Sequence, residues 1–245
     1  MIKSVSKIFR YIKNNLWRIR SLPYSMYFNF HYLPFKQAVK LPIMLYKPTL
    51  LKCAGSVVIE SDKVWHGMIC LGHNKCSIYP NTGITYENNG GKIVFKGSCQ
   101  IGKDCFVSVG PKGEISFGRR FECNAALKVA CHCKMDFSDD VSLGFDCFVV
   151  DTDFHQLSYA PIIHKTERKE RPKAYGPVFI GKGCWIGTKC TILKNTFLPA
   201  YCTVGSCSLL NKKYDVSEYA LLAGVPAVCK KVGYYRNRDD DKIMY

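Results

Sequence analysis

The sequence predicts an all-β fold, a parallel β-helix in which the chain winds in coils around a triangular core. Three observations point to it. Aliphatic residues recur every six positions over a long stretch, a small residue follows each of them by four positions, and short β-rich runs broken by Gly, Asn and Pro precede that stretch. In such hexapeptide repeats each six-residue unit forms a short strand and a bend, and three units complete one coil.

The clearest repeat begins at Ile180, where the chain reads IGKGCW, IGTKCT, ILKNTF, LPAYCT and VGSCSL. The aliphatic positions, which we expect to point into the core, are Ile180, Ile186, Ile192, Leu198, Val204 and Leu210. The small positions, which we expect beside the corners, are Cys184, Cys190, Thr196, Cys202 and Ser208. A period sustained over this length is the primary sign of a regular structure.

The same period returns upstream in three shorter runs. They are Phe95, Ile101 and Val107; Phe117, Cys123 and Val129; and Phe137, Leu143 and Val149. Short insertions such as GPKGE shift the frame between them. Before these runs, SVVIE, MICLG, SIYP and KIVFKG are β-rich and divided by turn residues, which predicts a first set of irregular coils. We therefore expect the β-helix to span residues 50–210.

Fourteen cysteines raise the question of disulfides or zinc. The repeat offers a simpler role, because seven of them occupy the small corner position: Cys99, Cys105, Cys133, Cys147, Cys184, Cys190 and Cys202. Cysteine behaves there as a small apolar side chain. The cluster Cys131-His132-Cys133 lacks a second pair of ligands at zinc spacing, so we expect no metal site. The absence of an evident secretory signal favours a reducing, cytoplasmic location with few disulfides.

The N-terminal segment, residues 1–49, is basic and aromatic. The net charge of the chain is +16, and ten Lys or Arg precede the first acidic residue, Glu60. The first twenty residues have the apolar spacing of an amphipathic helix, and an aromatic stretch interrupted by Pro23 and Pro34 follows. Two interpretations stay open: a helix packed on the β-helix or on another subunit, or a helix lying on an anionic membrane at its inner face. No run of eighteen apolar residues predicts a membrane-spanning helix.

Residues 211–245 lose the period, which predicts a loop or short helix that folds back on the last coil. The period also stops in the middle of the chain. After Val149 comes DTDFH, and a charge-rich stretch of some twenty residues then intervenes before Ile180, so we expect a loop over about residues 151–177 to leave the β-helix.

His155 lies in that loop, two residues after Asp153 and four after Asp151. A histidine beside two carboxylates is either a structural residue or a general base whose ring one acid orients. Both aspartates are candidates for orienting the ring. Asp153 also falls at the small corner position after Val149, where it would brace the coil instead.

Several motifs together resemble the left-handed β-helix hexapeptide acyltransferases, and among them the O-acetyltransferases that modify sugars of surface polysaccharides. They are DTDFH, GPVFIGKGCWIGTKCTIL, VGSCS and LLAGVPA, within about residues 50–232. The left-handed coiling comes from this resemblance, because spacing alone does not indicate the hand and crossovers are usually right-handed. The resemblance further implies a homotrimer, with acetyl-CoA bound between two subunits.

The same resemblance implies site residues. His155 would be the catalytic base, Asp153 or Asp151 would orient it, and the Thr188 N–H would bind the oxyanion. The residues implied for coenzyme A are Trp185, Gly187, Gly205, Ser206, Asn211, Lys212, Gly224 and Pro226. The family usually places a basic residue soon after AGVPA, but Val228 and Cys229 follow here, so phosphate contacts fall to Lys230, Lys231 or another chain. Asn124 and His164 are candidates for contact with the sugar, although Asn124 equally suits a turn.

The leading functional hypothesis is an acetyl-CoA-dependent O-acetyltransferase that acts on a sugar of a surface polysaccharide or its precursor. An amino-sugar N-acetyltransferase or an antibiotic acetyltransferase of the same fold is the nearest alternative. A non-catalytic scaffold that binds anionic lipid or RNA through the basic arm is an alternative of another class. A scaffold has no need of the coenzyme A motifs, so we expect the enzyme and no nucleic acid partner.

Overall fold

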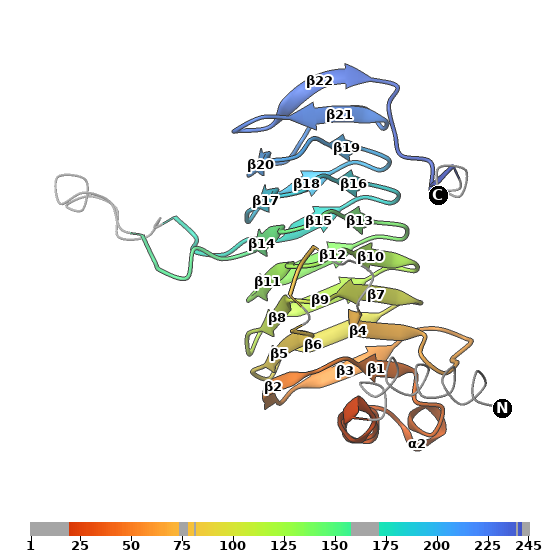
Figure 1. The fold of residues 1–245 in the computed structure, drawn as a ribbon. Helices are drawn as coiled ribbons and strands as arrows, with labels where there is room; N and C mark the ends of the chain where they lie inside the picture. The colour runs from red at the N-terminus through yellow and green to blue at the C-terminus, as the bar shows by residue number, and fades with distance from the viewer. Residues whose placement is uncertain (1–19, 74–77, 81, 158–171, 239, 242–245) are drawn as a thin grey trace, which may run out of the picture.

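The computed structural model describes residues 20–73, 78–80, 82–157, 172–238 and 240–241. These residues form a column of coils whose strands line up into three sheets around a common core, so that the molecule is a prism (Figure 1). The strand order within each sheet advances by three, because each coil gives one strand to each sheet in turn. All neighbouring strands are parallel except the last pair.

Sheet A contains β1 (Ile43–Leu45), β4 (Ile69–His73), β7 (Cys99–Gly102), β10 (Phe121–Cys123), β13 (Ser142–Leu143), β16 (Trp185–Ile186), β19 (Thr203–Val204), β21 (Ala220–Ala223) and β22 (Val228–Val232). Sheet B contains β2 (Thr49–Cys53), β5 (Ile84–Asn88), β8 (Cys105–Val109), β11 (Lys128–Cys131), β14 (Phe148–Val150), β17 (Thr191–Ile192) and β20 (Leu209–Leu210). Sheet C contains β3 (Ser56–Ile59), β6 (Lys92–Phe95), β9 (Glu114–Phe117), β12 (Lys134–Phe137), β15 (Val178–Ile180) and β18 (Phe197–Leu198). We name the prism edges by the sheets that meet there: AB, BC and CA.

The predicted repeat sets the register of the upper coils. Trp185 pairs with Thr203, and Thr203 pairs with Leu221, each eighteen positions further along the chain. Eighteen is three units of six, so one coil is three hexapeptides. The lower coils are longer, since Cys99 pairs with Phe121, twenty-two positions on. The insertions that shift the frame in the sequence are therefore the extra residues of these coils.

The inward positions of the repeat form the core, as predicted. All six aliphatics of the run that begins at Ile180 are at most 1% exposed. The residue before each small corner residue has a positive φ, and these residues are Gly183, Lys189, Asn195, Tyr201 and Cys207. That left-handed conformation costs of order 1–3 kcal/mol for most side chains. The period of six therefore marks the backbone bend as well as the buried side chain.

The cysteines are free thiols throughout the described part of the chain. Six of the seven predicted corner cysteines are buried, and burial raises the pKa of Cys147, for example, to about 12. The prediction is wrong for Cys133, which is half-buried, because its turn carries the chain from sheet B to sheet C beside Asp151. In the same described ranges no group of three His, Cys, Asp or Glu side chains lies close enough to hold a metal ion.

A helix over residues 20–32 covers the first coil at one end of the prism (Figure 1). Ser21, Ser25 and Asn29 lie on one line of this helix, each buried. The Asn29 amide donates to the Ile43 carbonyl at 2.7 Å and accepts from the Ile43 N–H at 3.1 Å. The Ser25 hydroxyl accepts from the Leu45 N–H at 3.0 Å. These side chains satisfy backbone N–H and C=O groups on the open edge of β1, as a neighbouring strand would. They thereby hinder the edge from pairing with a strand of another chain.

The N-terminal boundaries differ from the prediction. The first coil begins at Ile43, inside the segment predicted as 1–49, and the helix runs through Pro23 instead of being interrupted there. The bonds to β1 offset the hydrogen bond that proline cannot make. The helix predicted over the first twenty residues lies almost entirely outside the described part. None of the described helices is long and apolar enough to span a membrane.

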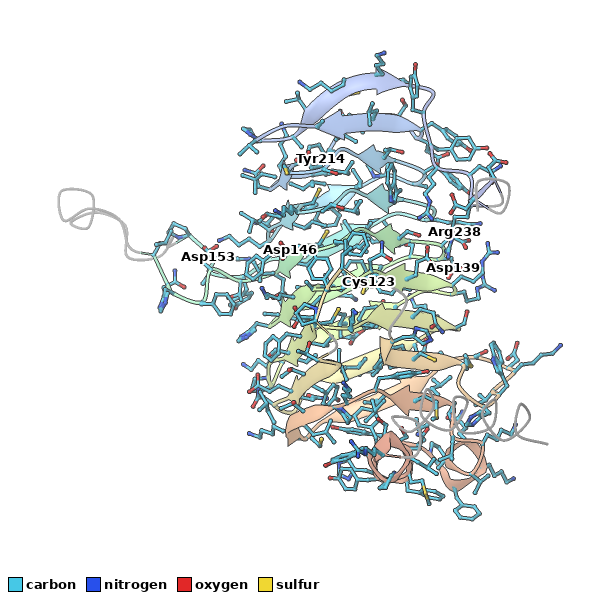
Figure 2. The ribbon with its side chains drawn as sticks, viewed as in Figure 1. Cys123, Asp139, Asp146, Asp153, Tyr214 and Arg238 are labelled. Atoms are coloured by element: carbon cyan, nitrogen blue, oxygen red, sulfur yellow. The ribbon has the colours of Figure 1, made fainter. Side chains whose placement is uncertain are left out.

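The C-terminal segment adds two strands, β21 and β22, where a loop or short helix was predicted. β21 continues sheet A beyond residue 210, and Leu222 is fully buried. β22 then returns antiparallel to it. The tail after β22 runs back along the CA side, where Arg238 pairs with Glu122 at 2.7 Å (Figure 2). A short helix, α2 (Phe35–Ala38), completes the described elements of regular structure.

Candidate active site

The loop that contains His155 leaves the prism at the BC edge, between β14 and β15 (Figure 1). Its base is closed by backbone pairing. Thr152 forms an antiparallel bridge with Tyr175, and the Asp153 N–H donates to the Ala174 carbonyl at 2.7 Å. The Gly176 N–H donates to the carbonyl of Asp151 at 2.9 Å. These bonds pair the outgoing and returning arms of the loop, and so fix where it leaves and rejoins the coil.

Asp151 belongs to the wall of the prism. Its carboxylate is fully buried and accepts from two backbone N–H groups, those of His132 and Cys133, each at 2.7 Å. The Cys131 thiol donates to the same carboxylate at 3.4 Å, and burial raises the pKa of that thiol. With both oxygens used by the turn between β11 and β12, Asp151 does not orient His155 as predicted. The role of bracing a corner of the coil, which was considered for Asp153, belongs to Asp151.

We expect Asp151→Asn to weaken the fold rather than the chemistry. The new amide would turn a donor toward one of the backbone N–H groups, and a buried group that loses its partner costs roughly 1–3 kcal/mol. Urea unfolding should show this loss in the free energy of unfolding, with turnover per folded molecule unchanged. Asp153→Asn, at an exposed carboxylate, is the matched control. Normal stability with lost turnover in Asp151→Asn would instead make Asp151 catalytic.

His155 is exposed on the outer side of the loop base. Phe154 precedes it with φ of +59°, which is strained for a bulky residue, and its ring meets the His132 ring edge-on at 5.7 Å between centroids. Asp153 forms an ion pair with Lys194, and the Lys194 ammonium also donates to the Lys173 carbonyl at 2.6 Å (Figure 2). Within the described ranges, no hydrogen bond to the His155 ring is present. Asp153 therefore holds the loop through Lys194 and does not contact the imidazole.

The predicted oxyanion donor lies on a different edge of the prism. Thr188 follows β16 at the AB edge, where its N–H donates to the Ser206 hydroxyl at 3.1 Å. Gly187 lies directly against the next coil, since a Cβ there would meet the Ser206 nitrogen at 2.6 Å. Close stacking of two coils thus accounts for this glycine without any cofactor. Ser206 itself is exposed, and with Thr188 it presents polar groups along the AB edge.

The AGVPA turn closes the top of the same AB edge. The Gly224 carbonyl accepts from the Leu209 N–H at 3.0 Å, and the Ala227 N–H donates to the Leu209 carbonyl at 2.8 Å. Pro226 is exposed at the tip of this turn. Lys230 and Lys231 are exposed on β22, which leads away from the turn along sheet A. These four predicted cofactor residues therefore surround the same end of the prism as Gly205 and Ser206.

The remaining predicted cofactor residues lie elsewhere. Trp185 faces outward from sheet A because its neighbour Ile186 points inward, and its ring lies 5.9 Å from the guanidinium of Arg236. Asn211 and Lys212 follow β20 at the BC edge, above His155 rather than beside Ser206. Within one chain, the predicted site is therefore divided between the AB edge and the BC edge. The width of sheet B separates the two edges, and four to five extended residues span roughly 15 Å.

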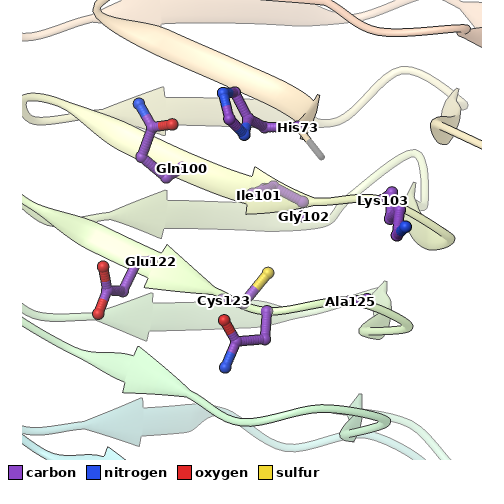
Figure 3. A pocket seen from close by; sticks show the side chains of 9 residues that line it. His73, Gln100, Ile101, Gly102, Lys103, Glu122, Cys123 and Ala125 are labelled. Atoms are coloured by element: carbon purple, nitrogen blue, oxygen red, sulfur yellow. The ribbon is translucent and has the colours of Figure 1, made fainter. Parts of the chain in front are cut away.

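Asn124 lines a small pocket at the lower AB edge, with His73, Gln100 and Glu122 (Figure 3). The pocket holds about 30 Å³, which suits one water and not a sugar. The role predicted for Asn124 in sugar contact therefore stays a prediction. His164, the other candidate for sugar contact, lies outside the described residues.

Two contacts near these edges were not foreseen from the sequence. Lys194 joins Asp153 to Lys173, although nothing in ILKNTF distinguishes this lysine from a solvated one. At the AB edge, Tyr79 stacks on Phe145 with ring centroids 5.4 Å apart. The connection after β4 thus reaches across to the coil just below Thr188. Only the folded coils bring these positions together, so no local pattern carries the signal.

Comparison with known proteins identifies the fold. No family model matches the chain, and no curated protein is similar to it in sequence. Among solved structures, the polySia specific acetyltransferase NeuO matches with a TM-score of 0.52 and 16% identity, covering 78% of this chain and 89% of that one. A mutant of AntD, an N-acyltransferase from Bacillus cereus, in complex with dTDP and coenzyme A, matches with a TM-score of 0.49 and 16% identity, covering 77% of this chain and 87% of that one.

This chain has the fold of NeuO. The left-handed parallel β-helix expected from the motifs is thereby confirmed. The likeness to NeuO spans most of both chains, so the prism is common to the two proteins and is not an isolated motif. At 16% identity the likeness to NeuO concerns the fold, and the roles of His155 and of the AB edge depend on the geometry described above.

Proposed function

We propose that the protein is an acetyltransferase that moves an acetyl group from acetyl-CoA to a hydroxyl of a sugar in a surface polysaccharide or its precursor. The observation that carries the proposal is the exposed imidazole of His155 on a loop whose two arms are paired at their base by backbone bonds. The fold supports it, since NeuO, which shares the prism, is an acetyltransferase specific for polySia.

In the proposed reaction, the oxygen of the sugar hydroxyl attacks the thioester carbonyl while His155 takes the hydroxyl proton. The carbonyl oxygen becomes an oxyanion, which the Thr188 N–H stabilises once the Ser206 hydroxyl turns away from it. The carbon–sulfur bond then breaks, and the departing coenzyme A thiolate takes the proton from the imidazolium of His155. The products are a sugar acetate ester and free coenzyme A, and the enzyme is unchanged.

We place the two halves of this site on neighbouring subunits. His155, Asn211 and Lys212 lie at the BC edge, whereas Thr188 and Ser206 lie at the AB edge. In a cyclic trimer each chain presents one surface to the next and another to the previous one. An arrangement with the AB edge of one chain against the BC edge of the next would unite the two halves around acetyl-CoA.

The test of the function is release of free coenzyme A on addition of candidate saccharides, with mass spectrometry of the product. We expect acetyl groups that mild alkali removes, as esters are cleaved and amides are not. Alkali-resistant acetylation of amino sugars would favour the N-acetyltransferase alternative. No release with any saccharide, together with binding of anionic lipid or RNA, would favour the scaffold.

Accessible cysteines give a direct test of where coenzyme A binds. Cys207, next to Ser206 at the AB edge, and Cys229 on β22 are the exposed thiols of the described residues. Buried thiols such as Cys147, with its raised pKa, should react slowly with alkylating reagents. We expect saturating acetyl-CoA to slow the labelling of Cys207 and to leave unchanged that of Cys53, a half-buried thiol on β2 at the other end of the prism, as measured by peptide mass spectrometry. Equal labelling of Cys207 with and without acetyl-CoA would move the binding site away from the AB edge.

A further inference from the structure

The helix at the end of the prism has a second face that none of the described residues covers. Its inner face is used by Ser25 and Asn29 against β1. We call the outer surface the end-cap face, which consists of Leu22, Met26, Tyr27, Phe30, Phe35 and Val39. Each of these side chains is between 38% and 73% exposed, with Phe35 the most exposed.

The end-cap face joins two elements, because Phe30 belongs to the helix and Phe35 to α2. The ring of Phe30 lies 6.1 Å from that of Phe35, and Tyr27 stacks on His31 with centroids 5.3 Å apart. Contiguous exposed apolar surface of this kind marks an interaction site, because isolated surface apolar residues are common but clusters are not.

Positive charge surrounds the end-cap face. Arg20, Lys36 and Lys40 are exposed beside it, and no acidic residue occurs in the sequence before Glu60. A hollow of about 340 Å³ opens at its margin, lined by Arg20, Ser21, Tyr24, Lys47 and Pro48. Two cationic residues and a phenol around a hollow suit a phosphate-bearing group.

We propose that the end-cap face binds an anionic lipid membrane, with the prism standing on its end. Aromatic side chains with a basic rim match the region between lipid tails and headgroups, where apolar side chains insert and cations meet anionic lipids. A second copy of the chain would set one basic rim against another, which disfavours end-to-end pairing. Nucleic acid would match the charge but not the apolar cluster around Phe30 and Phe35.

This orientation would set the height of the loop above the membrane. The loop follows β14, which lies four strand spacings above β2 in sheet B. The coil that carries the loop is therefore about 19 Å above the first coil. The height matters for catalysis only if the proposed acetyl transfer is correct. Lipid binding itself stands independently of that function, and its test below measures no activity.

The test is co-sedimentation of the full-length protein with phosphatidylcholine vesicles, with and without phosphatidylglycerol. We expect binding only to the anionic vesicles, and at least a tenfold weaker binding for Phe30→Asp. Val232→Asp is the matched control, because Val232 is an equally accessible apolar residue, 58% exposed on β22 at the opposite end. Unfolding midpoints and elution volumes of both variants establish that they are folded.

Charge is tested separately. We expect Lys36→Gln with Lys40→Gln to weaken binding roughly fivefold for each charge removed, and Lys112→Gln with Lys128→Gln, on the side walls, to change it little. The proposal is overturned if Phe30→Asp and Val232→Asp bind alike, or if deletion of residues 1–19 alone accounts for all binding. It is equally overturned if the face proves to join two copies, seen as self-association without lipid that Phe30→Asp abolishes.

Discussion

His155→Ala should reduce kcat by roughly 10²–10⁴-fold, the usual cost of removing a general base. The reason is geometric: His155 is an exposed imidazole on a loop whose two arms are paired at their base by the bonds of Thr152, Asp153 and Gly176. Coenzyme A release under saturating donor and acceptor measures the loss.

Binding of acetyl-CoA should survive in His155→Ala, because only Asn211 and Lys212 among the residues implied for the cofactor lie at the BC edge, where the loop leaves the prism. Isothermal titration of coenzyme A checks this. Lys194→Ala provides the comparison, because it removes the ion pair to Asp153 while leaving the imidazole in place. We expect it to lower kcat less than His155→Ala does. Near-normal transfer by His155→Ala would remove DTDFH from the catalytic mechanism.

The buried cysteines of the coils give no support to a covalent route. Burial raises the pKa of Cys99, Cys131 and Cys147, so these thiols stay protonated and weakly nucleophilic at neutral pH. Direct attack of the sugar oxygen on the thioester needs none of them. Trapping of an acetyl-cysteine would contradict the direct mechanism and leave the fold unaffected.

The core was predictable because its signal is local. Each unit of six places one side chain inward and one at a bend, so Ile186 or Cys190 can be assigned from its own neighbours. The failures have a different origin. The pairing of Asn29 with β1, and of Arg238 with Glu122, joins positions far apart in the chain. The first depends on the open edge of β1, and the second on the C-terminal tail meeting β10 in the middle of sheet A.

The carboxylates of the loop show the same limit. From the sequence alone, Asp151 and Asp153 are both candidates for orienting the His155 ring, and they lie two residues apart. The structure separates them, because Asp151 turns into the wall to bind the His132 and Cys133 N–H groups while Asp153 turns outward to Lys194. Residues two apart share one face of a regular strand, but β14 ends at Val150, so strand alternation does not assign these two carboxylates.

The divided site leads to a second large effect, which is recovery of activity from two inactive variants. His155→Ala removes the base at the BC edge. Ser206→Trp fills the AB edge at an exposed position, so it should block acetyl-CoA without disturbing the stacked coils. A larger residue at Gly187 would be a poor choice, because its Cβ would meet the Ser206 nitrogen at 2.6 Å. Each homogeneous variant should be nearly inactive.

Mixed trimers of the two variants should regain about one third of the wild-type activity per trimer, because a cyclic order of two kinds of chain always contains one junction with both an intact loop and an intact edge. Co-expression with two different affinity tags and sequential purification isolates these mixed assemblies, and coenzyme A release measures their turnover. Sedimentation of the wild type should show a trimer. If the doubly purified assemblies stay inactive, the loop and the AB edge of the same chain would have to form the site. The roughly 15 Å between the two edges would then have to be closed by a movement of the loop.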